Sequence, residues 1–170
     1  VVVEIGPCTP EATWVRSPDG TLGPGIWATT PGCLVFTDGS CRQDRSIARP
    51  CAGYAVVAIN TVGQVHAVGF GALPAESRQS AAAAEAWAAV RAVELHEGTV
   101  TLATDNAAVV TSFASPDTAS GPDKMMGSAY LRVASHIRAG AAAARKVPWH
   151  VAPDKCQHGS PAWVDALGNN

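Results

Sequence analysis

The sequence lacks the features that mark membrane, secreted and zinc-binding proteins. No apolar run in its 170 residues approaches the roughly 20 residues that a membrane-spanning helix needs. The opening Val1–Ile5 is too short for a secretory signal and is followed by glycine and proline. The five cysteines are an odd number and include no C-x-x-C pair, which argues against a disulfide framework and a zinc site. We therefore expect an intracellular protein, in the cytoplasm or the nucleus.

An excess of positive charge is also missing. Twelve lysines and arginines stand against 14 acidic residues, and the net charge of −2 argues against a strongly basic nucleic-acid-binding protein. One loop, Cys41–Cys51, concentrates positive charge in Arg42, Arg45 and Arg49. The length fits one domain with a core of its own. Because the chain begins with Val1 rather than methionine, we expect a piece of a longer protein.

Residues 1–32 differ in composition from the rest of the chain. Prolines and glycines alternate through this segment and leave no helical or strand period of useful length. Trp14 and Trp27 are the exceptions, and they would pin the segment onto the domain body. We expect either an ordered strap or a disordered linker here, followed by one domain over residues 33–170.

The body of the chain changes its hydrophobic period several times. Apolar runs rich in strand formers come first, and alanine-rich stretches of helix formers follow. Ser77 or Ser80 would cap the first long helix, and Gly98 would close it. A meander followed by alternating helices and strands predicts a mixed α/β sheet with helices on its faces. We predict strands at 34–36, 53–59, 64–70, 100–104 and 147–152. We predict helices at 77–96, 106–113, 124–145 and 161–167, the third of them broken near Gly140.

Four carboxylates take similar places in this pattern. Asp38 and Asp105 each follow a predicted strand, Glu85 lies among alanines on the first long helix, and Asp165 lies on the last helix. If the two strands are adjacent, their aspartates are neighbours that repel each other unless divalent cations neutralise them. Clustered oxygen ligands without histidine or cysteine suit magnesium or manganese. Taken alone, Asp38 is equally well a turn aspartate, and Glu85 is more often a solvent-facing residue.

At this point the chain resembles a type 1 ribonuclease H domain, of the kind fused to reverse transcriptases of retroelements or viruses. The resemblance covers residues 33–168 in the family's order of elements. It implies an α/β fold with a ribonuclease H-like mixed five-stranded sheet, three strands antiparallel and then two parallel, with helices on both faces. The matching stretches are Phe36–Ser40 (Phe-Thr-Asp-Gly-Ser), Gly53–Val57, Ser80–Ala89, Val100–Asn106 and His158–Leu167.

The resemblance also implies a chemistry. Asp38, Glu85, Asp105 and Asp165 would bind two Mg²⁺ ions, with Mn²⁺ as a substitute, about 4 Å apart as in other two-metal sites. The activity would be endonucleolytic hydrolysis of the RNA strand of an RNA–DNA hybrid, leaving 3′-hydroxyl and 5′-phosphate ends. The implied partners are the hybrid and a covalently linked reverse transcriptase, and the compartment would be the virion if the source is viral.

Several positions depart from the family pattern. Residues that grip the hybrid's minor groove usually precede the helix glutamate, and here Ala82 and Ala83 occupy those positions. The mobile histidine expected before the last aspartate is replaced by Lys155, and His158 is the nearest candidate for its role. The stretch 124–145 is too neutral to be the basic protrusion of some members. A substrate delivered by an attached polymerase would need little phosphate affinity from this domain.

Two alternatives remain open from the sequence. One is a catalytically silent binding or scaffold module on the same fold, since a fold does not fix a function. The other is a different nuclease of the same superfamily, such as a transposase, a resolvase or an exonuclease. For the nuclease, we expect the hybrid to be contacted by side chains that adjoin the aspartates and by the basic loop, namely Ser40, Asn106, Arg42, Arg45 and Arg49.

Overall fold

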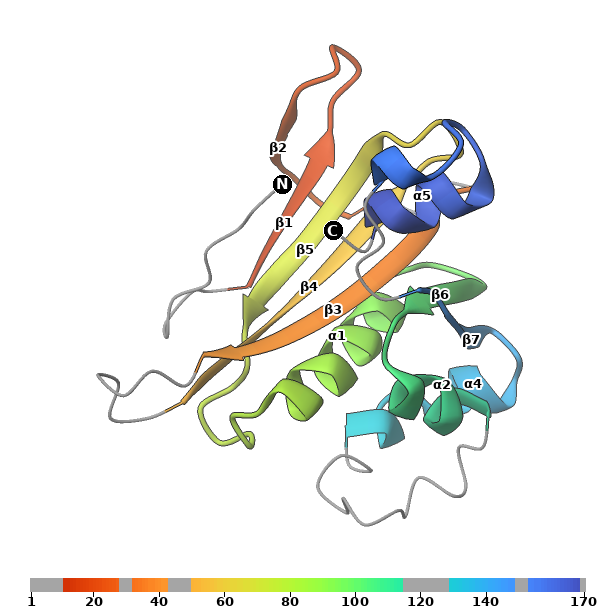
Figure 1. Cartoon of the computed structure of the whole chain (residues 1–170). Coiled ribbons are helices and arrows are strands. Elements are labelled where there is room, and N and C mark those ends of the chain that lie inside the picture. Colours follow the sequence, from red (N-terminus) through yellow and green to blue (C-terminus); the bar gives the residue numbers. More distant parts are fainter. Residues whose placement is uncertain (1–10, 28–31, 43–49, 115–128, 149–152, 169–170) are drawn as a thin grey trace.

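A seven-stranded mixed sheet organises the part of the chain that the structure describes. The computed structural model describes residues 11–27, 32–42, 50–114, 129–148 and 153–168. Along the sheet the strands follow the order β2-β1-β5-β4-β3-β6-β7 (Figure 1). Their bounds are β1 Ala12–Arg16, β2 Leu22–Pro24, β3 Leu34–Arg42, β4 Cys51–Ile59, β5 Val65–Ala72, β6 Val100–Thr104 and β7 Ala142–Lys146.

The central five strands have the predicted arrangement. β3, β4 and β5 form an antiparallel meander, and β6 and β7 run parallel to β3. The mixed α/β sheet is therefore confirmed, whereas the predicted number of five strands is wrong. The two additional strands, β1 and β2, extend the sheet beyond β5.

β1 and β2 lie inside the segment that we expected to be without strands. β1 pairs with β5, with Ala12 opposite Phe70, and β2 pairs with β1 through a turn at Gly20, whose φ is +86°. The described part of residues 1–32 is thus an ordered strap. Its strands are short and flanked by proline and glycine, so no period of useful length is visible in the sequence.

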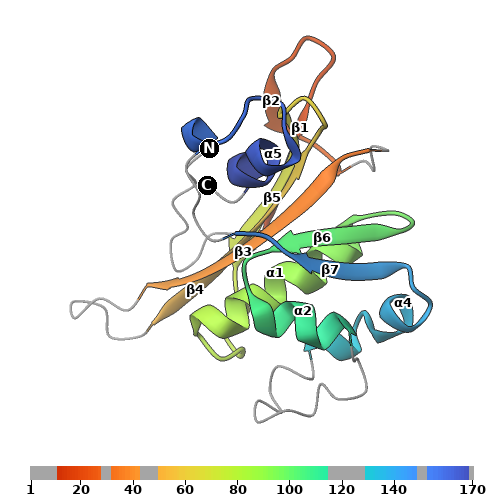
Figure 2. The ribbon, with the colours of Figure 1, turned by 45° about the vertical axis from the view of Figure 1, so that its right-hand side comes forward.

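Helices cover both faces of the sheet (Figures 1 and 2). Helix α1 begins after Ser80, whose side chain accepts a hydrogen bond from the amide of Ala83, as predicted for an N-cap. None of the described helices is long and apolar enough to cross a membrane. The bounds are α1 Ala81–Leu95, α2 Ala107–Ala114, α4 Ala134–Arg138, the 3₁₀ turn η2 Pro153–Lys155 and α5 Pro161–Gly168.

The predicted break near Gly140 is confirmed, but the helix expected after it, as far as residue 145, is wrong. The short helix α4 ends near Gly140, whose φ of +70° is favourable only for glycine, and β7 follows at once. β7 pairs with β6 from Val100–Ala142 to Thr104–Lys146, so the last strand lies before the predicted range 147–152. Alanine favours helix locally, but pairing with β6 overrides that preference. Residues 149–152 lie outside the described part of the chain.

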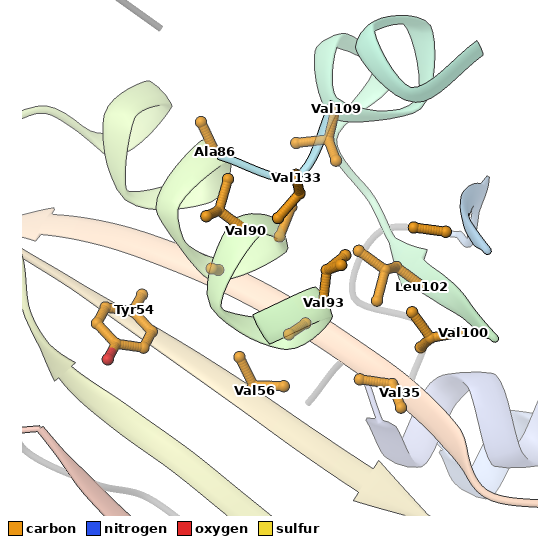
Figure 3. Close-up of a cluster of buried hydrophobic side chains, with 14 of the residues drawn as sticks. Val35, Tyr54, Val56, Ala86, Val90, Val93, Val100, Leu102, Val109 and Val133 are labelled. Carbon is orange, nitrogen blue, oxygen red and sulfur yellow. The ribbon is translucent and has the colours of Figure 1, made fainter. Parts of the chain in front are cut away.

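Two apolar clusters hold the layers together. The larger lies between α1 and the sheet, where Val90 and Val93 meet Val35, Val56 and Leu102 (Figure 3). The smaller lies on the opposite face, where α5 inserts Val164 against a group consisting of Phe36, Ile59, Ala103 and Val147. Asp38 and Glu85 therefore come from two layers that are packed tightly against each other.

Candidate active site

Asp38 lies in the middle of β3, at the point where β3 and β6 separate. The parallel ladder between these strands ends at the pair Phe36–Ala103. Asp38 follows Phe36 by two residues, and Asp105 follows Ala103 by two residues. The predicted strand at 34–36 is too short, because β3 continues through Asp38 and Gly39 and pairs with β4 as far as Arg42. Asp38 is exposed, and its Oδ1 accepts a hydrogen bond of 2.9 Å from the amide of Gly39. The two aspartates are thus neighbours, as the sequence led us to expect.

Glu85 reaches the same place because α1 crosses β3 at a glycine. A Cβ atom on Gly39 would lie 2.2 Å from the amide nitrogen of Glu85 and 2.8 Å from the Cβ of Ala84, so a side chain at position 39 would collide with the helix backbone. Glycine on the strand and alanine on the helix allow this close approach. The side chain of Glu85 is consequently buried, with 9% of its surface exposed, which rules out the solvent-facing interpretation.

The electrostatics of Glu85 are those of a carboxylate without a counter-ion. Burial, followed by the negative charges of Asp38 and Asp105, raises the pKa of Glu85 to about 8. Polar contacts with the backbone of Gly39 and the side chain of Asn106 act in the opposite direction but are weaker. The Oε2 atom of Glu85 is buried and has no hydrogen-bond partner. Such an atom is costly to bury unless a proton or a cation accompanies it.

This shift predicts a pH dependence of stability in metal-free protein. A carboxyl whose pKa is about 8 when folded and 4.5 otherwise stabilises the fold fully below pH 4.5 and loses that contribution as the pH rises through 8. We expect a loss on the order of 3 kcal/mol between pH 5 and 9, measured by urea unfolding in the presence of a chelator. Glu85→Gln should flatten this slope, and the same change at the exposed Glu76 should leave it in place. An equal slope in Glu85→Gln would contradict the assignment.

The turn after β6 fixes the neighbour of Asp105. The amide of Asn106 donates a hydrogen bond of 3.1 Å to Thr104 Oγ1. The side-chain oxygen of Asn106 accepts hydrogen bonds from the amides of Ala108 and Val109. Asn106 therefore caps α2, a role that we did not anticipate for a residue predicted to contact substrate. The signal was present in the sequence, since asparagine directly before a helix is a common N-cap.

The side chain of Asp165 on α5 is held by an arginine. Its two oxygens accept hydrogen bonds from Arg145 on β7, at 3.0 Å for Nη1 and 2.5 Å for Nη2. The hydrogen bond to Asp165 raises the pKa of the Arg145 guanidinium. We missed Arg145 because it fell within a predicted helix. The glycine at 140 and the proline at 148, which bound a short stretch, are the signal that could have revealed a strand.

The remaining predicted residues are dispersed. Ser40 and Arg42 are exposed on β3, beyond Asp38 along the same strand. His158 and Lys155 are exposed in the segment that leads into α5, and their role in turnover stays a prediction. Arg45 and Arg49 lie outside the described residues.

The carboxylate oxygens at this place are of the chemical type that binds a divalent cation. Asp38, Glu85 and Asp105 are hard oxygen donors, the charges of both aspartates act on Glu85, and one buried oxygen of Glu85 lacks a hydrogen-bond partner. Within the described residues, no three acidic, histidine or cysteine side chains converge on one point in this conformation. Ion binding would therefore require rotation of these side chains. The assignment of the four carboxylates as metal ligands stays a prediction.

Comparison with known proteins identifies the fold. No protein-family model and no curated protein matches the sequence. RNase H1 from the halophilic archaeon Halobacterium salinarum is similar in structure, with a TM-score of 0.52 at 19% identity over 68% of this chain and 85% of that one. The PFV RNase H domain is similar with a TM-score of 0.55 at 18% identity, over 85% and 98% of the two chains.

A third similar structure belongs to a longer protein. The foamy viral protease-reverse transcriptase in complex with an RNA/DNA hybrid gives a TM-score of 0.53 at 14% identity, over 69% of this chain and 17% of that one. The chain thus spans less than a fifth of that protein. These likenesses show that the chain has the ribonuclease H-like α/β fold.

Proposed function

We propose that this domain is a metal-dependent endonuclease that hydrolyses the RNA strand of RNA–DNA hybrids. The observation that carries the proposal is the meeting of Asp38, Glu85 and Asp105 where β3 and β6 separate, with a buried carboxylate oxygen that has no partner. Folding concentrates negative charge there at a cost in stability, and that arrangement is useful where cations are to be bound.

The chain's own residues would hold the cations and the substrate in place. Asp38, Glu85 and Asp105 would ligate one or two Mg²⁺ ions, or Mn²⁺ as a substitute. When bound, such ions supply an activated water and stabilise the leaving oxygen of a phosphodiester. Burial under α1 fixes Glu85, and the Gly39 amide orients Asp38 through its hydrogen bond. These residues position charge and take no direct part in bond breaking.

One face of β3 is suited to contact the nucleic acid. Asp38, Ser40 and Arg42 alternate along the strand on one face and are all exposed. A backbone lying along this row would meet the carboxylates first and the arginine last. Few basic residues are available elsewhere, so we expect weak affinity and a shallow dependence on salt for the isolated domain. The likeness to the hybrid-bound reverse transcriptase supports both the substrate and a reverse-transcriptase polyprotein as the context.

The test compares four labelled substrates in Mg²⁺, in Mn²⁺ and in a chelator. We expect cleavage of the RNA strand of a hybrid, with 3′-hydroxyl and 5′-phosphate products, and none of duplex DNA, single-stranded RNA or single-stranded DNA. Cleavage of duplex DNA would favour a transposase-like or resolvase-like nuclease. Binding of the hybrid without cleavage under either metal would favour the catalytically silent module, an alternative that the pairing of Asp165 with Arg145 keeps in view.

A further inference from the structure

The ion pair between Arg145 and Asp165 occupies both oxygens of the fourth carboxylate. Each oxygen accepts one hydrogen bond from the guanidinium, and the side chain of Asp165 is only 15% exposed. Two-point pairing of this kind is geometrically specific, because the planar fork of arginine matches a carboxylate. Asp165 thus has a cationic partner, whereas Oε2 of Glu85 has no hydrogen-bond partner among the described residues.

The backbone around the pair is held firmly. On α5, the residues that flank Asp165 are Val164 and Ala166, both of which are buried. Val164 packs in the cluster that also contains Ala103 of β6. Arg145 lies directly opposite Ala103 in the β6–β7 ladder, and Ala103 precedes Asp105 by two residues. Arg145 is therefore attached directly beside the strand that leads to Asp105.

We propose that Arg145 is a positioning residue that keeps both oxygens of Asp165 paired until a divalent cation displaces the guanidinium. This inference rests on the proposed function, since it takes Asp165 as a ligand of the cation. The oxygens keep free lone pairs, but a cation that approaches them meets the positive charge of the guanidinium, which lies 3.0 and 2.5 Å from the two oxygens. Cation binding and the Arg145–Asp165 pair are then in competition, and the pair lowers the apparent affinity of the site.

A purely structural role for the pair makes a different prediction. If Arg145 only fastens α5 to β7, its removal weakens the fold and leaves the affinity for cations unchanged or lower. If it competes for Asp165, its removal strengthens cation binding, and the effect requires Asp165. The two roles are therefore separable by binding measurements on the whole chain without any substrate.

The experiment is calorimetric titration of the full chain with Mn²⁺ and with Mg²⁺. Arg145→Gln is expected to bind the ions about twofold to fivefold more tightly, the range for release of one partly exposed ion pair. Lys146→Gln is the matched control, because it removes one positive charge from the next residue of the same strand. Its affinity should rise less than that of Arg145→Gln. In an Asp165→Asn background, Arg145→Gln should no longer change the affinity.

Three results would overturn the inference. The first is that Arg145→Gln and Lys146→Gln bind the ions with equal affinity. The second is that Arg145→Gln still raises the ion affinity in the Asp165→Asn background. The third is that Asp165→Asn binds the ions as tightly as the parent. Arg145→Lys keeps the positive charge but loses the planar two-point donor, and it replaces Arg145→Gln if that variant does not fold. Its ion affinity should lie between those of the parent and Arg145→Gln. A parent that cleaves hybrids while these variants show no difference refutes this inference alone. A parent that neither binds ions nor cleaves refutes the proposed function with it.

Discussion

Replacing Asp38 with asparagine is expected to lower the rate of hybrid cleavage at least about 10³-fold and to leave the fold intact. The carboxylate would supply charge to the bound cations, and its loss removes several kcal/mol of stabilisation from the charged transition state. Asparagine retains an oxygen that can accept the Gly39 amide, so the local hydrogen bond survives. The measurement is single-turnover cleavage at saturating Mg²⁺, together with circular dichroism of the variant.

The same substitution carries a second, independent signature. Asp38 is one of two charges that raise the pKa of Glu85, so its neutralisation should lower that pKa and stabilise the metal-free fold slightly. Asp19→Asn is the control, because Asp19 is an exposed aspartate in the turn between β1 and β2 and also accepts hydrogen bonds. It should leave cleavage unchanged. Wild-type turnover in Asp38→Asn would show that the site has been assigned wrongly.

Local sequence was sufficient to predict most elements of the body. The capped helix after Ser80 and the strand that precedes Asp105 were correct because their signals are local, namely an N-cap and a short apolar run. The glutamate among alanines suggested a close approach. Its burial could not be predicted, because that depends on the absence of a side chain at Gly39, a residue distant in sequence.

The wrong predictions of secondary structure have one cause, which is pairing with a strand that is distant in the sequence. Asp38-Gly39 has the composition of a turn, but pairing with β4 extends it as strand. Arg145 lies in an alanine-rich stretch that favours helix locally, and the free edge of β6 makes it a strand instead. The pairing of Arg145 with Asp165 follows from that strand, so it was invisible until β7 had been located.

The strap, residues 11–27, also depends on pairing with a strand that is distant in the sequence. It contributes β1 to the sheet and places Trp27, with 8% of its surface exposed, in the main core. Trp14 packs edge-to-face on Phe70 of β5, with ring centroids 6.2 Å apart. The strap is therefore integrated with the sheet through its pairing with residues 67–70 of β5.

An ion-pair network fastens the start of the strap to the body. Glu11 accepts a hydrogen bond of 2.6 Å from the hydroxyl of Tyr54 and forms an ion pair with Arg91 of α1. Arg91 also pairs with Glu94, and Glu94 with Arg132 at 2.7 Å. Tyr54 is almost completely buried, so removal of Glu11 would leave its hydroxyl without this partner.

A chain that begins at residue 33 is accordingly expected to lose most of its stability. Removal of a buried tryptophan side chain alone costs about 3–5 kcal/mol, against total stabilities of about 5–15 kcal/mol for ordinary domains. The truncation also exposes the edge of β5 that pairs with β1, which favours aggregation. Urea unfolding of the full and truncated chains is the measurement, with Trp27→Ala expected to account for the core contribution and Glu11→Gln for the network. If the truncated chain unfolds at the same urea concentration as the full chain, the strap is a separable tether and its contacts with the sheet contribute little to the fold.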